Sequence, residues 1–219
     1  MARLPRVVVP GYPHHVIQRG NRRQATFFCD KDYRAYIKLI AAAKGDAGVS
    51  ILAYCLMPNH VHIVAVPETT ESLADLFKEA HRRYTRRINL REDWRGHLWQ
   101  ERFHSYVMDE THLVAAVRYI ELNPVRAGLC KQPDDWHWSS VHAHLAARDD
   151  TLTNTGPMLE RISNWRSYLS CANSDETLQK LRQHAHTGRP LGSDEFIANL
   201  EAISGRLLRP KKPGRKRKK

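Results

Sequence analysis

The sequence predicts an α+β fold of the ferredoxin-like type, in which an antiparallel sheet carries helices on one face. The first observation is the order of segments over residues 14–108, namely strand, helix, strand, strand, helix, strand. The second is a pair of apolar runs that meet at Pro58 and Asn59, as the two arms of a hairpin do. The third is the helical spacing of apolar residues in the two segments between strands.

The first half of the predicted sheet follows from residues 14–66. Residues 14–18 form a strand, and a polar turn follows at residues 19–23. A helix begins at Asp30 and runs to about residue 44, because apolar side chains recur there every three or four positions. The two strands of the hairpin occupy residues 54–66, on either side of its turn.

A second helix, a last strand and a third helix complete the predicted main domain. The second helix runs from Ser72 to about residue 89, and the strand covers residues 104–108. The third helix covers residues 110–122 and ends at Asn123, because a proline at the next position disfavours helical geometry there. We expect this helix to lie beside the sheet and to face His60 and His62.

We divide the chain into three parts. Residues 1–145 form the main domain, residues 146–205 a helical extension, and residues 206–219 a basic tail that is predicted to be disordered. Within the extension, residues 176–184 and 194–203 are expected to form short helices. The pattern leaves open whether the extension is a small DNA-binding unit or an arm that docks on the main domain.

The composition points to a soluble cytoplasmic protein without a membrane partner. Of the 219 residues, 42% are hydrophobic, but no run approaches the roughly 20 apolar residues that span a bilayer. The first residues are charged and lack the apolar centre of a signal peptide. None of the four cysteines pairs with another at the spacing of metal ligands, so reduced structural thiols are expected.

Positive charge is concentrated at the C-terminus. The formal net charge is +12, and residues 206–219 supply nine positive charges with no acid, which leaves 12 − 9 = +3 for the rest. Polycationic tails bind nucleic-acid phosphates by releasing counterions. DNA is therefore the expected partner, and the alternative is a tail that only improves solubility.

The short pattern His60-Val-His62 is the first candidate for chemistry. On a strand, residues i and i+2 point to the same side, so the two imidazoles would project together and could hold one metal ion. Spacing alone equally allows one polar face of a half-buried sheet. The pairs His142/His144 and His184/His186 lie in helix-like or loop segments, where i and i+2 point apart, and we predict surface histidines there.

Tyr119 and Asn123 form the second candidate. Their i, i+4 spacing on the third helix places them on one face. Small residues surround Tyr119 on this face, which leaves room for a substrate or for close packing against the sheet. A tyrosine on a helix is more often a packing residue than a nucleophile.

Three motifs together resemble a known family. They are YCLMPNHVHIV at residues 54–64, GHLWQERF at 96–103 and RYIELNPVRAG at 118–128. In this order they resemble the single-domain tyrosine transposases of the HUH endonuclease class, and most of all the REP-associated tyrosine transposases of bacteria. The resemblance covers about residues 8–145. Residues 187–196 and the basic end resemble the C-terminal extension of some members.

The resemblance implies a role for each candidate residue. His60 and His62 would bind a divalent ion, Mg²⁺ or Mn²⁺, with Asn123 as third ligand. Tyr119 would be the nucleophile that cuts single-stranded DNA beside a hairpin and forms a 5′-phosphotyrosine. Asn123 fits the REP-associated branch, since the mobile insertion-sequence branch typically has Gln there. That mobile branch works as dimers, so a homodimer is one expectation for this chain.

Other polar residues are candidate DNA contacts. The set comprises Arg19, Asn21, Arg22, Arg82, Arg83, Arg86, Arg87, Trp99 and Arg102. The arginines between 82 and 87 could equally form a solvated helix end, and Trp99 could pack in the core rather than stack on bases. A competing function is a non-enzymatic DNA-binding regulator of repeat sequences, and a third is a nickase of replication or conjugation.

Overall fold

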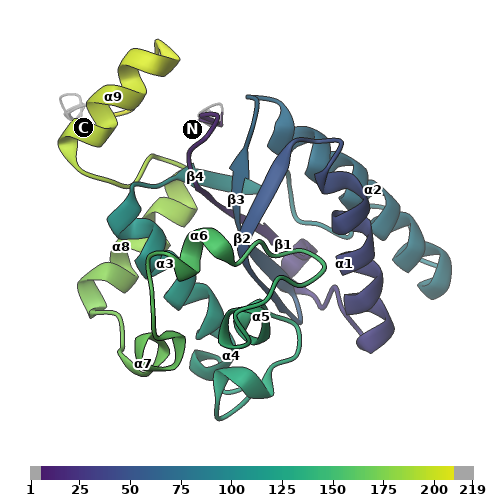
Figure 1. The fold of residues 1–219 in the computed structure, drawn as a ribbon. Coiled ribbons are helices and arrows are strands. Elements are labelled where there is room, and N and C mark those ends of the chain that lie inside the picture. The colour runs from purple at the N-terminus through teal and green to yellow at the C-terminus, as the bar shows by residue number, and fades with distance from the viewer. Residues whose placement is uncertain (1–5, 210–219) are drawn as a thin grey trace, which may run out of the picture.

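Four antiparallel strands form the centre of the computed structural model, which describes residues 6–209 (Figure 1). They are β1 (His14–Arg19), β2 (Val49–Met57), β3 (His60–Pro67) and β4 (His104–Val107). Their order in the sheet is β2-β3-β1-β4, and every neighbouring pair is antiparallel. This is the strand order of a ferredoxin-like sheet, so the predicted fold class is confirmed.

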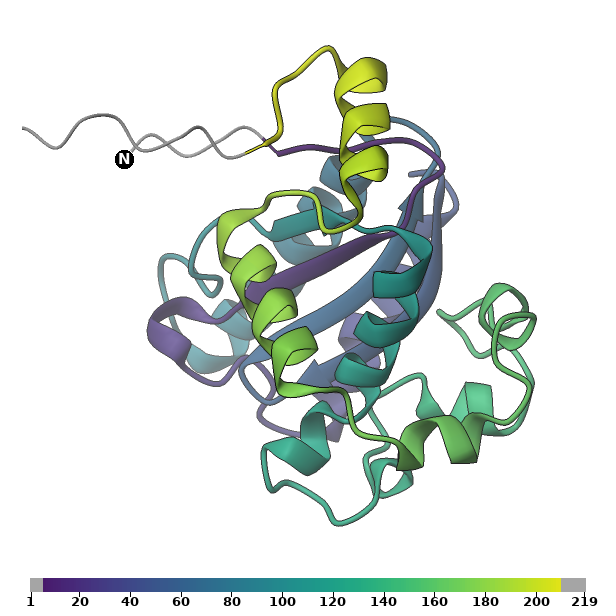
Figure 2. The same cartoon turned by 90° about the vertical axis from the view of Figure 1, so that its left-hand side faces the viewer.

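Helices cover both faces of the sheet (Figures 1 and 2). As predicted, α1 (Asp30–Lys44) and α2 (Ser72–Glu92) share one face. The helix α3 (Glu110–Glu121) lies over the opposite face, with α8 (Asp175–Thr187) beside it. The helix α3 therefore packs over a face of the sheet rather than beside it, and the expectation that it faces the histidines is confirmed by Tyr119, whose ring lies 5.9 Å from that of His62.

Strand alternation explains why both faces can be covered. Along β3, Val61 and Ile63 point into the core beneath α1 and α2, whereas Val64 belongs to the core beneath α3. His60 and His62 have the same parity as Val64, so they also face α3. The helix α3, which carries Tyr119, thus packs over the face of the sheet that carries the two histidines.

The ends of α3 follow from local sequence. Asp109 caps its start, since its carboxylate accepts the backbone N–H of His112 at 2.9 Å. The helix ends at Glu121, close to the predicted end. A short helix that was not predicted, α4 (Asn123–Arg126), follows at once and holds Pro124 in its first turn, where a missing N–H costs no hydrogen bond.

Residues from the C-terminal part of the chain close both edges of the sheet. On the β2 edge, the Leu56 N–H donates to the Trp138 carbonyl, and the Asn154 N–H donates to the Ile51 carbonyl, each at 2.8 Å. On the β4 edge, the Leu191 N–H donates to the Val107 carbonyl at 2.9 Å. Open strand edges tend to pair with other chains, so this closure protects the sheet.

The remaining elements are short, apart from the last helix. They are the 3₁₀ helices η1 (Asn21–Arg23) and η2 (Pro133–Asp135), and the α-helices α5 (Val141–Leu145), α6 (Gly156–Leu159), α7 (Trp165–Ser170) and α9 (Asp194–Ser204). The helices α8 and α9 confirm the two predicted in the extension. Among the described helices, none has the length and apolar character needed to cross a bilayer.

The beginning of the predicted tail folds back on α9. The backbone N–H groups of Leu208 and Arg209 both donate to Oε1 of Glu201, at 2.7 and 3.1 Å. Residues 206–209 are therefore held in place, in contrast to the disorder predicted for the tail. The rest of that segment, residues 210–219, lies outside the described residues. The division of the chain at residue 145 stays a prediction.

A partly buried ion pair joins the two helices of the first face and predicts sensitivity to acid. Arg91 of α2 binds the fully buried carboxylate of Asp32 with two hydrogen bonds of 2.5 and 3.0 Å. Burial of Asp32 opposes its ionisation, but the hydrogen bonds and charge of Arg91 outweigh burial and hold the pKa of Asp32 below its ordinary value. The pair therefore stabilises the fold above about pH 4, and this contribution is lost as the pH falls through the lowered pKa.

We expect Asp32→Asn to lower the free energy of unfolding by about 1–3 kcal/mol at pH 7, and by less at pH 3. Urea unfolding at the two pH values measures this difference. Asp30→Asn is the matched control, because its pair with Arg34 is exposed on both sides and contributes about 0–1 kcal/mol. An equal loss at pH 7 and pH 3 for Asp32→Asn would contradict the prediction.

Candidate active site

Two imidazoles form the centre of the candidate site at the start of β3. The ring centroids of His60 and His62 lie 4.9 Å apart, and the rings are nearly perpendicular, at 80°. Both side chains point to the α3 face, as their spacing on a strand requires. The structure thus brings the two predicted metal ligands together.

In each of the two imidazole rings, Nδ1 is hydrogen-bonded to another side chain of the protein. Nδ1 of His60 bonds Oδ1 of Asn59 at 2.6 Å, and Nδ1 of His62 bonds Nε2 of His15 at 2.8 Å. The Nε2 atoms of both rings are left for another partner. Burial, aided by the Arg19 charge, lowers the pKa of His60 to about 4. Burial first, and then nearby positive charges, lower the pKa of His62 well below its usual range, so both rings carry lone pairs at neutral pH.

His15 is a part of the site that sequence reasoning missed. Its Nε2 meets His62 and its Nδ1 meets the hydroxyl of Tyr106 at 2.8 Å. Burial lowers the pKa of His15 to about 3 and raises that of Tyr106 well above its usual range. If Nε2 of His62 is to bind an ion, its Nδ1 carries the proton and donates to His15, which in turn donates to Tyr106. The chain of hydrogen bonds then fixes the His62 tautomer.

Tyr119 lies beside these histidines in the same chain. Its ring centroid is 5.9 Å from that of His62 and 6.3 Å from that of His15, with the ring planes steeply inclined to one another. The side chain is half-buried, so part of it is accessible from outside. The phenol of Tyr119 lies next to the imidazoles because α3 packs over this face of the sheet.

Asn123 and Arg126 complete the group one helical turn later. The guanidinium of Arg126 lies 4.1 Å above the Tyr119 ring, and its Nη2 donates to the Tyr119 carbonyl at 2.7 Å. The same atom donates to Oδ1 of Asn123 at 3.0 Å. Arg126 therefore ties the tyrosine to the asparagine. Sequence reasoning missed this residue because it lies on α4, a helix that the pattern did not predict.

The donor atoms are compatible with a divalent ion. Among residues 6–209, no group of three or more His, Cys, Asp or Glu side chains could hold a metal. The candidate set has instead two imidazoles and the amide of Asn123, whose buried Nδ2 has no hydrogen-bond partner and whose Oδ1 keeps a second lone pair. Neutral ligands leave the charge of an ion available for phosphate oxygens, and Mn²⁺ and Mg²⁺ accept such oxygens readily.

A buried polar cluster holds α3 from its other side. Glu121 accepts hydrogen bonds from the Ser140 hydroxyl and from Nδ1 of His144 at 2.6 Å each, and from Nε1 of Trp165 at 2.8 Å. All of these side chains are buried. The prediction that His144 is a surface histidine was wrong, because α5 turns it toward Glu121 and onto the Trp165 ring.

The other predicted surface histidines lie closer to expectation. His142 and His186 are exposed, and His184 is half-buried with its Nδ1 bonded to the Arg189 carbonyl at 2.9 Å. Periodicity could not separate His144 from His142, because both lie in one short helix and only the tertiary packing distinguishes them.

Some candidate DNA contacts adjoin the site. Arg19 pairs with His60 in the β1–β3 register, and Asn21 and Arg22 follow directly in η1. Arg22 adopts φ 51°, in the left-handed region that non-glycine residues rarely enter and that is often found at functional sites. This basic turn and the histidines therefore occupy the same end of the sheet.

The other candidate contacts lie on α2 and beneath it, on the opposite face of the sheet. Arg82 and Arg83 both bind Glu79, at 3.0 and 2.6 Å, and Arg86 and Arg87 are exposed on the same helix. Trp99 is buried in the core beneath α2, as the packing alternative expected. The structure thus does not bring the α2 arginines or Trp99 to the histidines, and Arg102 is exposed in the loop after Trp99.

Comparisons with known proteins bear on this site. The family model described as "Transposase IS200 like" matches residues 8–123. A REP-associated tyrosine transposase of Escherichia coli K12 is 28% identical over 115 residues, which are 52% of this chain and 67% of that relative. A putative REP-associated tyrosine transposase of Haemophilus influenzae is 27% identical over 107 residues, 44% of this chain and 61% of the relative.

Among solved structures, one similar fold is a REP-associated tyrosine transposase bound to a REP hairpin. Its TM-score is 0.59 at 22% identity, and the match covers 71% of this chain and 93% of that chain. This similarity supports the fold. The residues matched by the family model include His60, His62, Tyr119 and Asn123, and they end just before Arg126.

Proposed function

Because the chain belongs to the IS200-like transposase family, we propose that it nicks and rejoins single-stranded DNA beside hairpin-forming repeat sequences. The proposed reaction depends on a divalent metal ion and passes through a 5′-phosphotyrosine on Tyr119. One observation carries this proposal, namely a half-buried tyrosine whose ring lies 5.9 Å from that of His62, in a pair of histidines that each have an available Nε2 atom.

The proposed substrate comes from the relatives and from charge. A solved structure of similar fold holds a REP hairpin, and the curated relatives bear the name REP-associated tyrosine transposase. The net charge of +12 favours binding to DNA phosphates. We therefore propose hairpin DNA with a single-stranded flank as the partner, and the cytoplasm as the place of action.

The chemistry can be written for the residues of the site. Nε2 of His60, Nε2 of His62 and Oδ1 of Asn123 would hold Mg²⁺ or Mn²⁺. A bound ion would polarise the scissile phosphate and stabilise the charge of its pentavalent transition state. The Tyr119 hydroxyl attacks the phosphorus and gives up its proton, the bond from phosphorus to O3′ breaks, and the departing O3′ takes up a proton. Attack by a 3′-hydroxyl on the phosphotyrosine reverses these steps and needs no ATP.

Arg126 positions the nucleophile for this step. Arg126 packs on the Tyr119 ring and bonds Asn123, so it keeps the attacking and ligating side chains in fixed relation. The closeness of Tyr119 and His62 within one chain supports a site built in a single subunit. The homodimer stays a prediction, which sedimentation with and without DNA would test.

Covalent capture of DNA tests the proposal. Wild-type protein is incubated with an end-labelled hairpin that has a single-stranded flank, with Mn²⁺ or with EDTA. We expect a labelled band at the size of a protein–DNA adduct on a denaturing gel in Mn²⁺ and none in EDTA. A non-enzymatic regulator would bind the hairpin equally in both conditions without forming the adduct, and that result would replace the proposal.

The hydrogen bond from His62 to His15 gives a separate prediction. Partners that orient a metal-bound histidine commonly contribute 10–100-fold to metal affinity, so we expect His15→Leu to weaken Mn²⁺ binding by roughly that factor. Calorimetry or the paramagnetic resonance of free Mn²⁺ measures the affinity without any cleavage. His14→Leu is the matched control, since His14 is equally buried but bonds Tyr12 and Val9 on the other side of the strand. Equal losses in the two variants would argue for a general effect on folding.

A further inference from the structure

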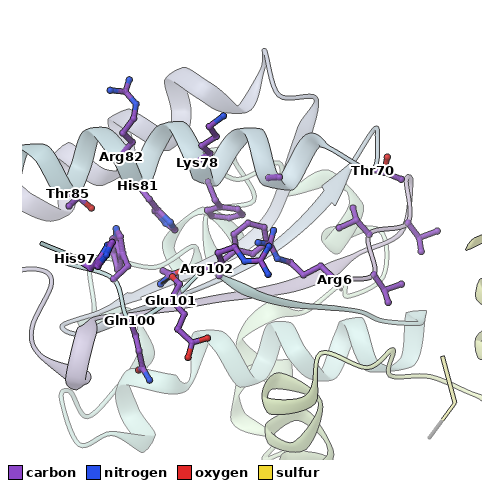
Figure 3. Close-up of a pocket in the computed structure, with 18 of the residues that line it drawn as sticks. Arg6, Thr70, Lys78, His81, Arg82, Thr85, His97, Gln100, Glu101 and Arg102 are labelled. Carbon is purple, nitrogen blue, oxygen red and sulfur yellow. Dashed lines mark hydrogen bonds between the residues drawn. The ribbon is translucent and has the colours of Figure 1, made fainter. Parts of the chain in front are cut away.

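A large cavity of the described chain lies on the face of the sheet away from the histidines. Its volume is about 1200 Å³. Its walls come from α2, from the loop of residues 97–103, from residues 6–10 and from the end of α9 (Figure 3). The proposed reaction makes no use of this space, although small-molecule sites are typically hollows of about 300–1,000 Å³.

Flat rings line the inner part of the cavity. Phe77 of α2 packs against Phe103 with ring centroids 4.8 Å apart, and His81 packs on Trp99 at 4.7 Å. The guanidinium of Arg6 lies 3.8 Å above the Phe103 ring, so this ring already accommodates one flat group. Aromatic walls of this kind stack on bases whatever the base is.

Two buried polar atoms in the wall have no hydrogen-bond partner among the described residues. They are Oε1 of Gln18 and Nε1 of Trp99, on side chains that are only 3% and 8% exposed. Nε2 of Gln18 donates to the Glu101 carbonyl at 3.0 Å, which fixes the amide so that the acceptor is the atom left over. The edge of a nucleobase carries donors and acceptors that could bond such groups, and a buried polar atom is costly as long as it has no partner.

Positive side chains also line the cavity. Lys78 and Arg82 belong to α2, where Figure 3 draws them on the side of the helix away from the His81 ring, and Arg102 lies in the loop of residues 97–103. All three are exposed, whereas the aromatic and amide groups lie deeper. Lysine and arginine at the rim of an apolar hollow favour a phosphate outside and a flat ring inside.

We infer that this cavity binds one unstacked nucleotide of the DNA strand, with its base against the rings and its phosphate at the rim. Gln18 and Trp99 would bond the edge of the base, and Lys78 and Arg102 the phosphate. The inference rests on the proposed single-stranded DNA substrate. It places a second DNA contact on the face opposite the nucleophile, so the bound strand passes around an end of the sheet.

Removal of one base at a time, with the backbone left intact, tests the inference. Labelled hairpins with a single-stranded flank, each carrying one abasic position, are titrated in EDTA against protein with the Tyr119→Phe change, so that nothing is cleaved. We expect one position at which the abasic site weakens binding about 10-fold. This penalty should fall below about twofold in Gln18→Met, which removes the amide, with its acceptor and its donor to the Glu101 carbonyl, while nearly keeping the size of the side chain. A flank without such a position, or an unchanged penalty in Gln18→Met, would overturn the inference.

Variants of exposed side chains test the same site without disturbing the fold. Lys78→Ala with Arg102→Ala changes only exposed side chains and should reduce the slope of log affinity against log salt by about 1 to 2. Lys38→Ala on α1, exposed and away from the cavity, is the control that should leave the slope almost unchanged. An equal slope in the double variant and the control would contradict a phosphate at this rim.

A competition experiment identifies the source of the nucleotide. Free deoxynucleoside monophosphates at 1 mM should not displace the hairpin. Displacement that disappears in Gln18→Met would assign the cavity to a free nucleotide and overturn the assignment to the strand. The adduct experiment reports on catalysis alone. A protein that forms no adduct but retains the abasic penalty would therefore refute the proposed reaction and leave this site intact.

Discussion

Tyr119→Phe should eliminate the covalent adduct with hairpin DNA and reduce cleavage by a factor on the order of 10³ or more. The change removes a single oxygen atom and keeps the ring that packs against His62, His15 and the Arg126 guanidinium. Because those ring contacts survive, the free energy of unfolding and the affinity for the hairpin in EDTA should stay close to the wild-type values. Adduct formation on a denaturing gel and single-turnover cleavage in Mn²⁺ measure the loss.

Two other tyrosines serve as controls. Tyr84 is fully buried on the face beneath α2, where its hydroxyl donates to the Thr26 carbonyl at 2.7 Å, so Tyr84→Phe should retain the adduct. Tyr106 is closer to the histidines, but it is fully buried and its hydroxyl bonds His15. An adduct of undiminished yield in Tyr119→Phe would show that another side chain attacks the phosphate, and Tyr106→Phe would be the next variant to examine.

Glu121→Ala should lower the free energy of unfolding by about 3–5 kcal/mol, the usual cost of removing one partner from a buried polar pair. The carboxylate accepts three hydrogen bonds from buried donors on Ser140, His144 and Trp165. Its loss would leave those donors without a partner and open a cavity between α3 and the extension. Urea unfolding followed by circular dichroism measures the change.

A matched variant is available on the same helix. Glu110 pairs with Arg161, but its side chain is 67% exposed, so Glu110→Ala should cost no more than about 1 kcal/mol. Glu121→Gln should fall between the two, because the amide keeps the shape and one acceptor while it places a donor against a donor. A loss for Glu121→Ala as small as that for Glu110→Ala would show that the cluster is not holding α3.

Local patterns predicted those parts of the fold that depend on neighbours along the chain. Apolar residues at helical spacing marked α1 and α2, and the hairpin at Pro58 marked β2 and β3. That α3 packs over the sheet rather than beside it could not be predicted in this way, because it depends on which side of a sheet, assembled from distant strands, is left open. The short helix α4 was missed because Pro124 indicates the end of a helix as readily as the first turn of another.

In the candidate site, too, local spacing predicted some residues, whereas others depend on contacts between distant segments. His60 with His62, and Tyr119 with Asn123, were found because spacing within one strand or one helix places each pair on a common face. That the two pairs meet depends on α3 lying over the sheet. His15 was missed because only the β1–β3 register reveals that it meets His62. The pair of Glu121 and His144 and the cavity beside Gln18 likewise join segments far apart in the sequence.

The closure of both sheet edges by residues after position 137 bears on how this protein can be engineered. The matched region ends at residue 123, yet the strands inside it depend on Trp138, Asn154 and Leu191 for their outer hydrogen bonds. A fragment that ends at residue 123 would leave both edge strands of the sheet without these hydrogen-bond partners. Such open edges tend to pair between molecules, so we expect the fragment to aggregate. Fusions that borrow this catalytic module for genome manipulation should therefore attach their cargo outside residues 6–209.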